Sequence, residues 1–203
     1  PWSGRAEGSA LNDEGDGLRA RRRANLGRLL KPRHIAFIGG SHLELCIGLC
    51  RRAGFTGDIH VVNPRRDEIA GIACTPTIDD LPEPPDAAFV ALSRERTIEA
   101  MAELALIGVG GAVCHAAGFG ELGGKSRDLQ SELVSAASGM AMVGPNCMGV
   151  INAFDRVILW GADGHFEAVD GSGIALISQS GALLYGLVNV ERAYPMGYGL
   201  SLG

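Results

Sequence analysis

Short apolar segments alternate along this chain with segments of helical periodicity, and glycine, proline or asparagine follows most of the apolar segments. Continuous apolar runs of about four to eight residues are typical of strands that are buried on both faces. Strands that alternate with helices are typical of parallel sheets covered by helices on both sides, so the sequence predicts an α/β fold. The expected strands are 34–38, 58–62, 87–92, 111–115, 140–143 and 174–177, with a last strand that begins near Tyr198.

Helices are expected between these strands, at 18–31, 43–53, 97–107, 126–137 and 182–192. Two segments are expected to lack regular structure. Residues 1–17 are rich in Gly, Ser, Asp and Glu and predict a loose tail, and the glycines of residues 152–172 predict an irregular connection. A single strand–helix–strand unit cannot bury its own faces, so residues 173–203 are expected to form an incomplete second domain.

The composition excludes several classes of protein. With 203 residues, 46% of them hydrophobic, the chain can form a core, and no apolar run reaches the roughly 18–20 residues of a membrane helix. The net charge of −5 argues against nucleic acid as the main partner. The charge is uneven, +4 over residues 1–33 and −9 over residues 34–203, which fits either an anionic partner or membrane surface, or a solvated helix face. No secretory segment is recognised, so the expected location is the cytoplasm.

The five cysteines are scattered along the chain and odd in number, so a disulfide framework is not expected in a reducing compartment. Cys46 and Cys50 are one helical turn apart and could both contact a metal. No second pair of Cys or His at ligand spacing stands beside them, which favours two buried thiols on one helix face. No metal site is therefore expected.

The first expected strand ends in Gly39-Gly40-Ser41 and runs into a helix. Glycine lets the backbone approach a phosphate closely, and the amides at a helix N-terminus face an anion. The spacing does not match G-x-G-x-x-G, because the next glycine is Gly48. A phosphate site and a purely structural turn are both compatible with this pattern.

The second expected strand ends in Asn63-Pro64-Arg65-Arg66. A dinucleotide-binding domain usually places a carboxylate there to bind the ribose hydroxyls, and this chain has two guanidinium groups instead. A guanidinium suits a phosphorylated ribose, because its fork geometry pairs with phosphate oxygens. NADP and coenzyme A both carry such a group, at the 2′ and 3′ positions respectively. The alternative is a pair of exposed loop arginines.

A third candidate anion site follows the strand 174–177. Ser178, Gln179, Ser180 and Gly181 stand at the start of the next expected helix. Their backbone amides and the two hydroxyls could converge on one anion. Ordinary capping of the helix is the alternative.

Five motifs occur in order at plausible spacing: AFIGGS (36–41), VNPR (62–65), AAGFGE (116–121), GPNCMG (144–149) and ISQSGA (177–182). Together they resemble the CoA-binding part of the nucleoside-diphosphate-forming acyl-CoA synthetases, which are related to the succinyl-CoA synthetase alpha subunit. The resemblance covers roughly residues 26–203, and GPNC-x-G and SQSGA are its most specific motifs. It implies a Rossmann-like parallel-sheet CoA-binding domain at 26–150, a linker at 151–172 and the start of a flavodoxin-like ligase domain at 173–203. The composition and charge of residues 1–25 predict a flexible basic segment before them.

The resemblance also implies a reaction, in which acid, CoA and ATP give acyl-CoA, ADP and phosphate through an acyl phosphate and a phosphohistidine. None of the five histidines matches the phosphohistidine motif, so no catalytic residue is expected in this chain. ATP, ADP and Mg²⁺ would act only through an ATP-grasp domain or subunit outside the chain. The implied ligands are CoA and a small carboxylic acid or its acyl-CoA, and a homo- or hetero-oligomer would fit the family.

The resemblance assigns residues to three sites. Ser178, Gln179, Ser180 and Gly181 would hold the phosphate or the phosphohistidine, and Tyr185 would lie near the acyl substrate unless it belongs to the core. The implied CoA-binding residues are Gly39, Gly40, Ser41, His42, Asn63, Pro64, Arg65, Ala91, Leu92, Ser93, His115, Ala116, Ala117, Asn146 and Cys147. Many relatives carry more glycine and a lysine in the first turn, where this chain has His42-Leu43-Glu44-Leu45, and His115 replaces a small or hydroxyl residue. A carboxylate near a pyrophosphate opposes binding.

Two other functions are compatible with parts of the pattern. A CoA- or acyl-CoA-sensing module of a regulatory protein, such as an acyltransferase fusion, would bind the ligand without turning it over. An NADP-dependent oxidoreductase would use the same arginines, but the missing G-x-G-x-x-G and the GPNC motif argue against it.

Overall fold

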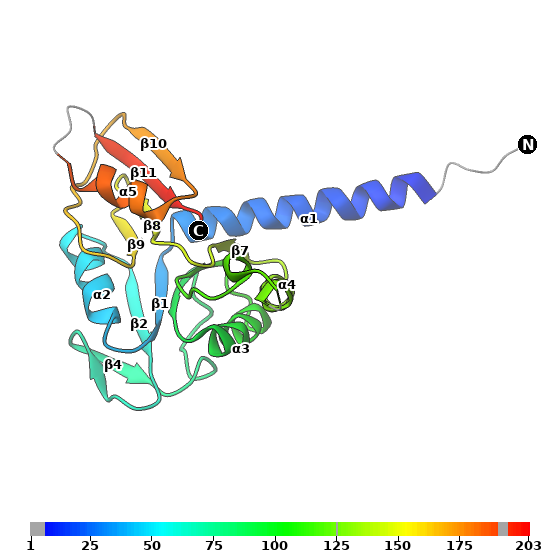
Figure 1. The fold of residues 1–203 in the computed structure, drawn as a ribbon, viewed down its shortest axis with the longest axis horizontal. Helices are drawn as coiled ribbons and strands as arrows, with labels where there is room; N and C mark the ends of the chain where they lie inside the picture. Colours follow the sequence, from blue (N-terminus) through cyan, green and yellow to red (C-terminus); the bar gives the residue numbers. More distant parts are fainter. Residues whose placement is uncertain (1–6, 125, 191–194) are drawn as a thin grey trace, which may run out of the picture.

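A computed structural model describes residues 7–124, 126–190 and 195–203, and it confirms the α/β prediction (Figure 1). The larger sheet has seven strands in the order β3-β4-β2-β1-β5-β6-β7. All neighbours are parallel except β3 and β4, which form an antiparallel pair at one edge. The strands are β1 (His34–Gly39), β2 (Asp58–Val62), β3 (Glu68–Ile69), β4 (Ile72–Thr75), β5 (Ala87–Ala91), β6 (Gly111–Cys114) and β7 (Ala141–Val143).

Helices cover both faces of this sheet, as continuous apolar strands require. On one face, Ile35 and Phe37 of β1 pack with α2 (Leu43–Arg52) and with the end of α1 (Glu7–Leu30). On the other face, Ala36 and Ile38 pack with α3 (Arg94–Leu106) and α4 (Ser126–Ala136), which follows the short 3-10 helix η1 (Gly120–Leu122). Successive residues of one strand therefore enter two different cores.

A second sheet of four strands has the order β10-β11-β8-β9. Its strands are β8 (Gly149–Asn152), β9 (Val157–Trp160), β10 (Ile174–Ser178) and β11 (Met196–Ser201), and α5 (Gly181–Val188) lies between the last two. The prediction of an irregular segment over 152–172 is wrong for β9. All of its four residues are apolar and buried, and Ile158 and Trp160 pack with Leu49 of α2. The energy of this packing outweighs the preference of the following glycines, Gly161 and Gly164, for irregular structure.

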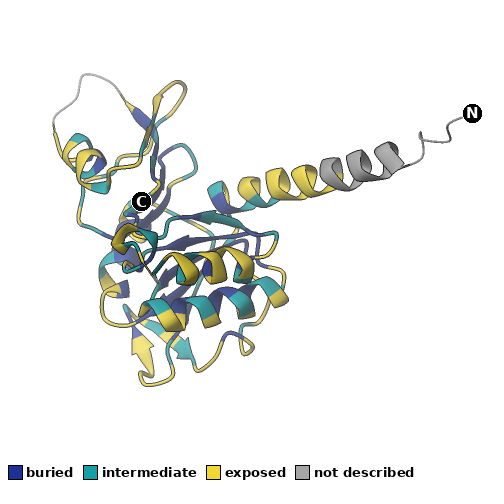
Figure 2. Ribbon diagram, turned by 45° about the vertical axis from the view of Figure 1, so that its right-hand side comes forward, coloured by how far each residue is buried: buried dark blue, intermediate teal, exposed yellow. Residues whose placement is uncertain are grey.

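The N-terminal helix is longer than expected. Helix α1 begins at Glu7, so the prediction of a loose tail is wrong for 7–17, and residues 1–6 lie outside the described residues. Ala, Leu, Glu and Arg are good helix formers and continue the helix across its glycines. The helix extends away from the sheets, and its arginine-rich turn at 19–23 is exposed (Figures 1 and 2). The expected helix 182–192 ends at Val188, and residues 191–192 are not among those described.

The end of α1 is fixed to the sheet by one buried carboxylate. Asp86, just before β5, accepts hydrogen bonds from Arg28 Nε at 2.8 Å, Arg33 N at 3.0 Å and Arg33 Nε at 3.2 Å. Only 6% of the Asp86 side chain is exposed. Among the described helices, none combines the length and the hydropathy that crossing a membrane would need.

Candidate functional site

The carboxyl ends of β1, β2 and β5 meet at one edge of the larger sheet, which is where ligands bind in open α/β folds. Gly39 ends β1 with a φ of +153°, and a Cβ atom there would lie 2.6 Å from the carbonyl oxygen of Ala91 on β5. Only glycine fits this close approach. The Nδ2 group of Asn63, just after β2, donates to the Gly39 carbonyl over 2.6 Å and joins the two strand ends.

Asn63 also shapes the turn that follows β2. Its Oδ1 atom accepts hydrogen bonds from the backbone amides of Arg65 at 2.8 Å and Arg66 at 3.0 Å. An asparagine that bonds amides two and three residues ahead fixes a turn without using the backbone carbonyl. The sequence Asn-Pro-Arg-Arg thus holds two neighbouring guanidinium groups at the end of β2.

The two arginines have different surroundings. Arg66 Nη1 lies 3.0 Å from Glu44 Oε1 of α2, and this exposed ion pair offsets the carboxylate that stands near the first turn. Arg65 forms no ion pair among the described residues, and it lines a cavity of about 530 Å³. The strand-end cleft, as we call this cavity, is also lined by Gly39, Gly40, Asn63, Pro64 and Leu92.

Another guanidinium that the sequence did not single out lines the strand-end cleft. Arg96 lies in the first turn of α3, three residues after Ser93, and reaches the cleft from the side opposite β2. Acidic side chains of Asp79, Glu99 and Glu103 line the same cleft. A helix-initial arginine after the end of β5 was the only signal for Arg96 in the sequence.

A second cavity, of about 460 Å³, lies between the two sheets. The residues that line this inter-sheet cavity are His115, Ala117, Asn146, Cys147, Met148, Gln179, Ser180, Gly181, Ala182 and Gly203. It therefore brings together the end of β6, the GPNC turn and the start of α5. Asn146 has a φ of +57°, and its amide donates to the carbonyl of Ala116 over 2.8 Å.

His115 is held in one tautomer at this cavity. Its Nδ1 atom lies 2.8 Å from the carbonyl oxygen of Cys147, and because a carbonyl only accepts, Nδ1 carries the proton. The ring stacks on His42 with 5.2 Å between centroids and on Phe89 with 5.7 Å. Burial lowers the pKa of His115, the Cys147 carbonyl opposes this change in part, and the nearby His42 lowers the pKa further. At neutral pH, His115 is therefore an uncharged imidazole with Nε2 as an acceptor.

The start of α5 has the geometry of an ordinary helix cap. Ser180 Oγ accepts from the amide of Leu183 at 3.3 Å, and Ser178 Oγ donates to the carbonyl of Ser180 at 2.9 Å. A Cβ atom on Gly181 would lie 2.9 Å from Met148 Cγ, so glycine lets the helix start approach the GPNC turn. Both hydroxyls thus bond to the backbone, and the first turn of α5 lines the inter-sheet cavity.

Four of the five cysteines, Cys46, Cys50, Cys114 and Cys147, are buried, and Cys74 is partly exposed. Cys147 Sγ contacts the carbonyl oxygens of Cys114 at 3.3 Å and Val143 at 3.5 Å, and burial raises the pKa of Cys147 to about 12. Cys46 and Cys50 lie on the buried face of α2, which confirms the buried-thiol alternative, and burial raises their pKa values to about 12 and about 11.

The remaining predicted residues are placed as follows. Ala91 ends β5 and is the register partner of Gly39. The backbone carbonyls of Ser41 and Ser93 accept hydrogen bonds from the amides of Glu44 and Thr97 at the starts of α2 and α3. Tyr185 donates from its hydroxyl to Asp163 Oδ1 at 2.7 Å on an exposed surface, and it does not line the inter-sheet cavity. Hydrogen bonding to Asp163 raises the pKa of Tyr185.

Comparisons with known proteins identify the family to which this chain belongs. The family model described as a CoA binding domain matches residues 33–153. A trans-feruloyl-CoA synthase from an unknown prokaryotic organism is 35% identical over 78% of this chain and 24% of its own length. The ADP-forming acetate–CoA ligase I of Archaeoglobus fulgidus is 34% identical over 87% of this chain and 26% of its own length.

A solved structure has the same fold. The apo form of the dinucleotide-forming acetyl-coenzyme A synthetase 1 of Ca. Korarchaeum cryptofilum superposes with a TM-score of 0.80 and 30% identity, over 88% of this chain and 40% of that one. The chain spans about a quarter of the length of the two curated relatives. The family model covers more than half of the chain, across the strands, glycine turn and arginines described above, and the chain therefore belongs to the CoA-binding domain family.

Proposed function

We propose that this chain is the CoA-binding portion of an ADP-forming acyl-CoA synthetase. The observation that carries the proposal is the strand-end cleft, which is lined both by the glycine turn of β1 and by Arg65, a residue with no ion pair in the described part of the chain. CoA carries a 3′-phosphate on its ribose and a pyrophosphate on the same nucleotide. The guanidinium of Arg65 suits the 3′-phosphate, and the glycine turn suits the pyrophosphate. The similarity to a trans-feruloyl-CoA synthase and an ADP-forming acetate–CoA ligase supports the same ligand.

In this proposal, the ligand runs from one cavity to the other. The adenosine end occupies the strand-end cleft, and the thiol arm passes His42 and His115 into the inter-sheet cavity. There, Asn146 and the first turn of α5 surround the acyl end and the phosphate. The uncharged imidazole of His115 adds no positive charge to this cavity at neutral pH.

The whole reaction needs groups that the proposal places outside this chain. Acid, CoA and ATP give acyl-CoA, ADP and phosphate, and an ATP-grasp domain or subunit supplies the nucleotide and Mg²⁺ sites. The proposed substrate is a small carboxylic acid, and the division at residues 150 and 172 into CoA-binding domain, linker and ligase domain belongs to the same proposal. The five free thiols support a reducing compartment, the cytoplasm.

The thermal stability of the chain tests the ligand. CoA at about 100 times its Kd is expected to raise the Tm by about 5–10 °C, because a ligand that binds only the folded state stabilises it by about 2.7 kcal/mol at that ratio. NADP at the same concentration is expected to leave the Tm unchanged. Circular dichroism melts in a titration of each nucleotide give the answer, and a rise with NADP alone would rule out CoA as the ligand.

A sensing module is the second candidate, and one observation favours it. Both hydroxyls at the start of α5 are bonded to the backbone, as in a plain helix cap. The two functions differ in turnover of the whole polypeptide. The polypeptide is incubated with γ-³²P-labelled ATP, acid, CoA and its ATP-grasp domain or subunit. A synthetase then forms acyl-CoA and ADP, and one of its histidines carries the labelled phosphoryl group. A sensor binds CoA and does neither.

A further inference from the structure

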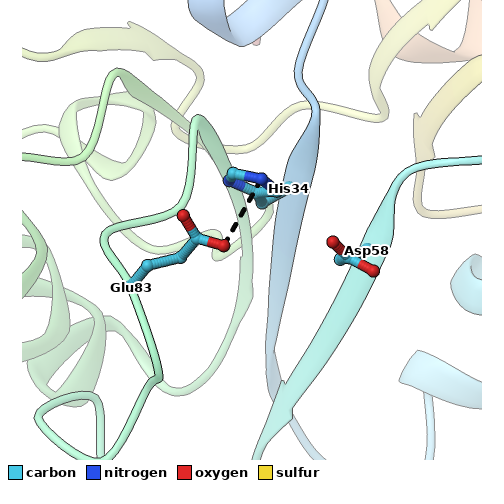
Figure 3. A group of neighbouring side chains, drawn as sticks. All are labelled: His34, Asp58 and Glu83. Atoms are coloured by element: carbon cyan, nitrogen blue, oxygen red, sulfur yellow. Dashed lines mark ion pairs between the residues drawn. The ribbon is translucent and has the colours of Figure 1, made fainter.

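At the edge opposite the strand-end cleft, three side chains with metal-binding atoms lie together (Figure 3). His34 begins β1, Asp58 begins β2, and Glu83 lies in the loop before β5. One atom from each, a ring nitrogen and two carboxylate oxygens, lies within 4.8 Å of the others. The proposed CoA site uses none of these residues.

The backbone holds two of the three groups side by side. His34 and Asp58 are register partners in the parallel pair of β1 and β2, so their side chains leave the same face of the sheet. Only 14% of the His34 side chain is exposed. Ligands on adjacent strands are held more precisely than ligands on a loop.

The third group comes from a stiff loop. Glu83 stands between Pro82 and Pro84, and both prolines restrict the backbone around it. Its Oε1 atom lies 3.4 Å from His34 Nε2, and no hydrogen bond joins these groups among the described residues. Two ligand atoms on a tetrahedral zinc ion, with bonds of about 2.0–2.2 Å, are separated by about that distance.

The neighbouring cations do not compete for these carboxylates. The guanidinium groups of Arg28 and Arg33 are both bonded to Asp86. Lys31 is paired with Asp155 at 2.7 Å. Among the described residues, Asp58 has no ion-pair partner and Glu83 faces only His34, so both carboxylates are open to a ligand beside His34.

We propose that His34, Asp58 and Glu83 bind one Zn²⁺ ion. One imidazole and two carboxylates suit this borderline cation better than Mg²⁺, which prefers oxygen ligands and keeps its water. The ion joins β1, β2 and the loop that leads into β5, and water completes its tetrahedral coordination. It stabilises the sheet at the edge away from the ligand.

Titration of the tag-free chain with ZnCl₂ by calorimetry tests the site. The expected result is one ion per chain with a Kd below about 100 μM, and a Tm raised by about 5–10 °C at 100 times the Kd. MgCl₂ is expected to give neither effect. His34→Gln, Asp58→Asn and Glu83→Gln are each expected to weaken Zn²⁺ binding by more than about tenfold, since even residues behind the ligands cost that much.

Three controls make the result specific. His34→Lys places a positive charge beside Glu83 but is expected to lose the metal, which separates a metal site from a simple ion pair. His165→Gln removes the other described histidine–glutamate contact, 3.3 Å from Glu167, and is expected to leave Zn²⁺ binding unchanged. The two carboxylate variants alter exposed groups, so they report even if His34→Gln fails to fold.

The proposal is overturned by an absence of binding, by a Kd above about 1 mM, or by binding that survives the loss of both carboxylates. It is also overturned if the cobalt-substituted chain shows a thiolate charge-transfer band, because the metal would then sit on a cysteine such as the partly exposed Cys74. The Tm rise with CoA is expected to be the same in the wild type and in Glu83→Gln. A failure of the CoA proposal would therefore be seen in the CoA melts and would leave the result of the Zn²⁺ titration unaffected.

Discussion

Arg65→Ala is expected to weaken CoA binding by about 10- to 100-fold and to leave the binding of dephospho-CoA within about twofold of the wild-type value. A hydrogen-bonded pair between a guanidinium and a phosphate contributes about 1.5–3 kcal/mol, and only CoA carries the 3′-phosphate. Arg65 lines the strand-end cleft and has no ion-pair partner among the described residues, so its charge is free for this phosphate. Calorimetric titration of both nucleotides into both proteins measures the difference.

Arg66→Ala is the matched control, because Arg66 is the next residue along the chain and is already paired with Glu44. Its loss exposes a carboxylate near the first turn, and any resulting decrease is expected to be equal for CoA and dephospho-CoA. Equal losses for the two nucleotides in Arg65→Ala would contradict the assignment of Arg65 to the 3′-phosphate.

Asp86→Asn is expected to lower the free energy of unfolding by about 2–4 kcal/mol. Removing one partner of a buried ion pair costs about 3–5 kcal/mol, and partial exposure of Arg28 and Arg33 to water reduces that cost. The end of α1, the start of β1 and the start of β5 all depend on this carboxylate. Urea unfolding at neutral pH measures the change, and Glu95→Gln, which breaks the exposed pair with Arg94, is expected to leave the urea midpoint unchanged.

The effect of Asp86 depends on pH in a defined direction. Burial alone would raise the pKa of Asp86, but the hydrogen bonds from Arg28 and Arg33 outweigh it and hold the pKa below its usual value. A lowered pKa gives stability that is complete above the unfolded-state pKa of about 3.9 and is lost as the pH falls through the folded-state value. The difference between wild type and Asp86→Asn is therefore expected to be constant from pH 7 to about pH 5 and to shrink below about pH 4. A difference that stayed constant down to pH 2 would contradict this account.

The sequence predicts the larger sheet well, because its strands are continuous apolar runs buried by helices on both sides. Strand 58–62 is found at the expected residues, and β1 extends one residue beyond the prediction, to Gly39. The prediction from sequence fails where tertiary contacts determine the secondary structure. Strand β9 is a four-residue apolar run that pairs with β8 and packs against α2, and these contacts are not visible in its local sequence.

In the candidate site too, the sequence predicts the residues that follow strand ends, and it does not predict the contacts between elements that are distant along the chain. Gly39, Asn63 and Arg65 follow strand ends, so the sequence predicts that they meet, and they do meet in the strand-end cleft. The contact of Glu44 with Arg66 joins residues on α2 and after β2, and a local motif does not show it. Arg96 reaches the cleft because α3 crosses the sheet face, which depends on the packing of two cores.

The contact of Gly39 with Ala91 has a consequence for engineering. The space beside Gly39 is taken up by the pairing of β1 with β5, and the proposed CoA site adjoins the same residue. A library that randomised this position would select against folding before it could select for a new nucleotide specificity. Redesign should therefore vary the rim of the cleft, at Thr77 and Arg96, where an altered side chain meets solvent and not a neighbouring strand.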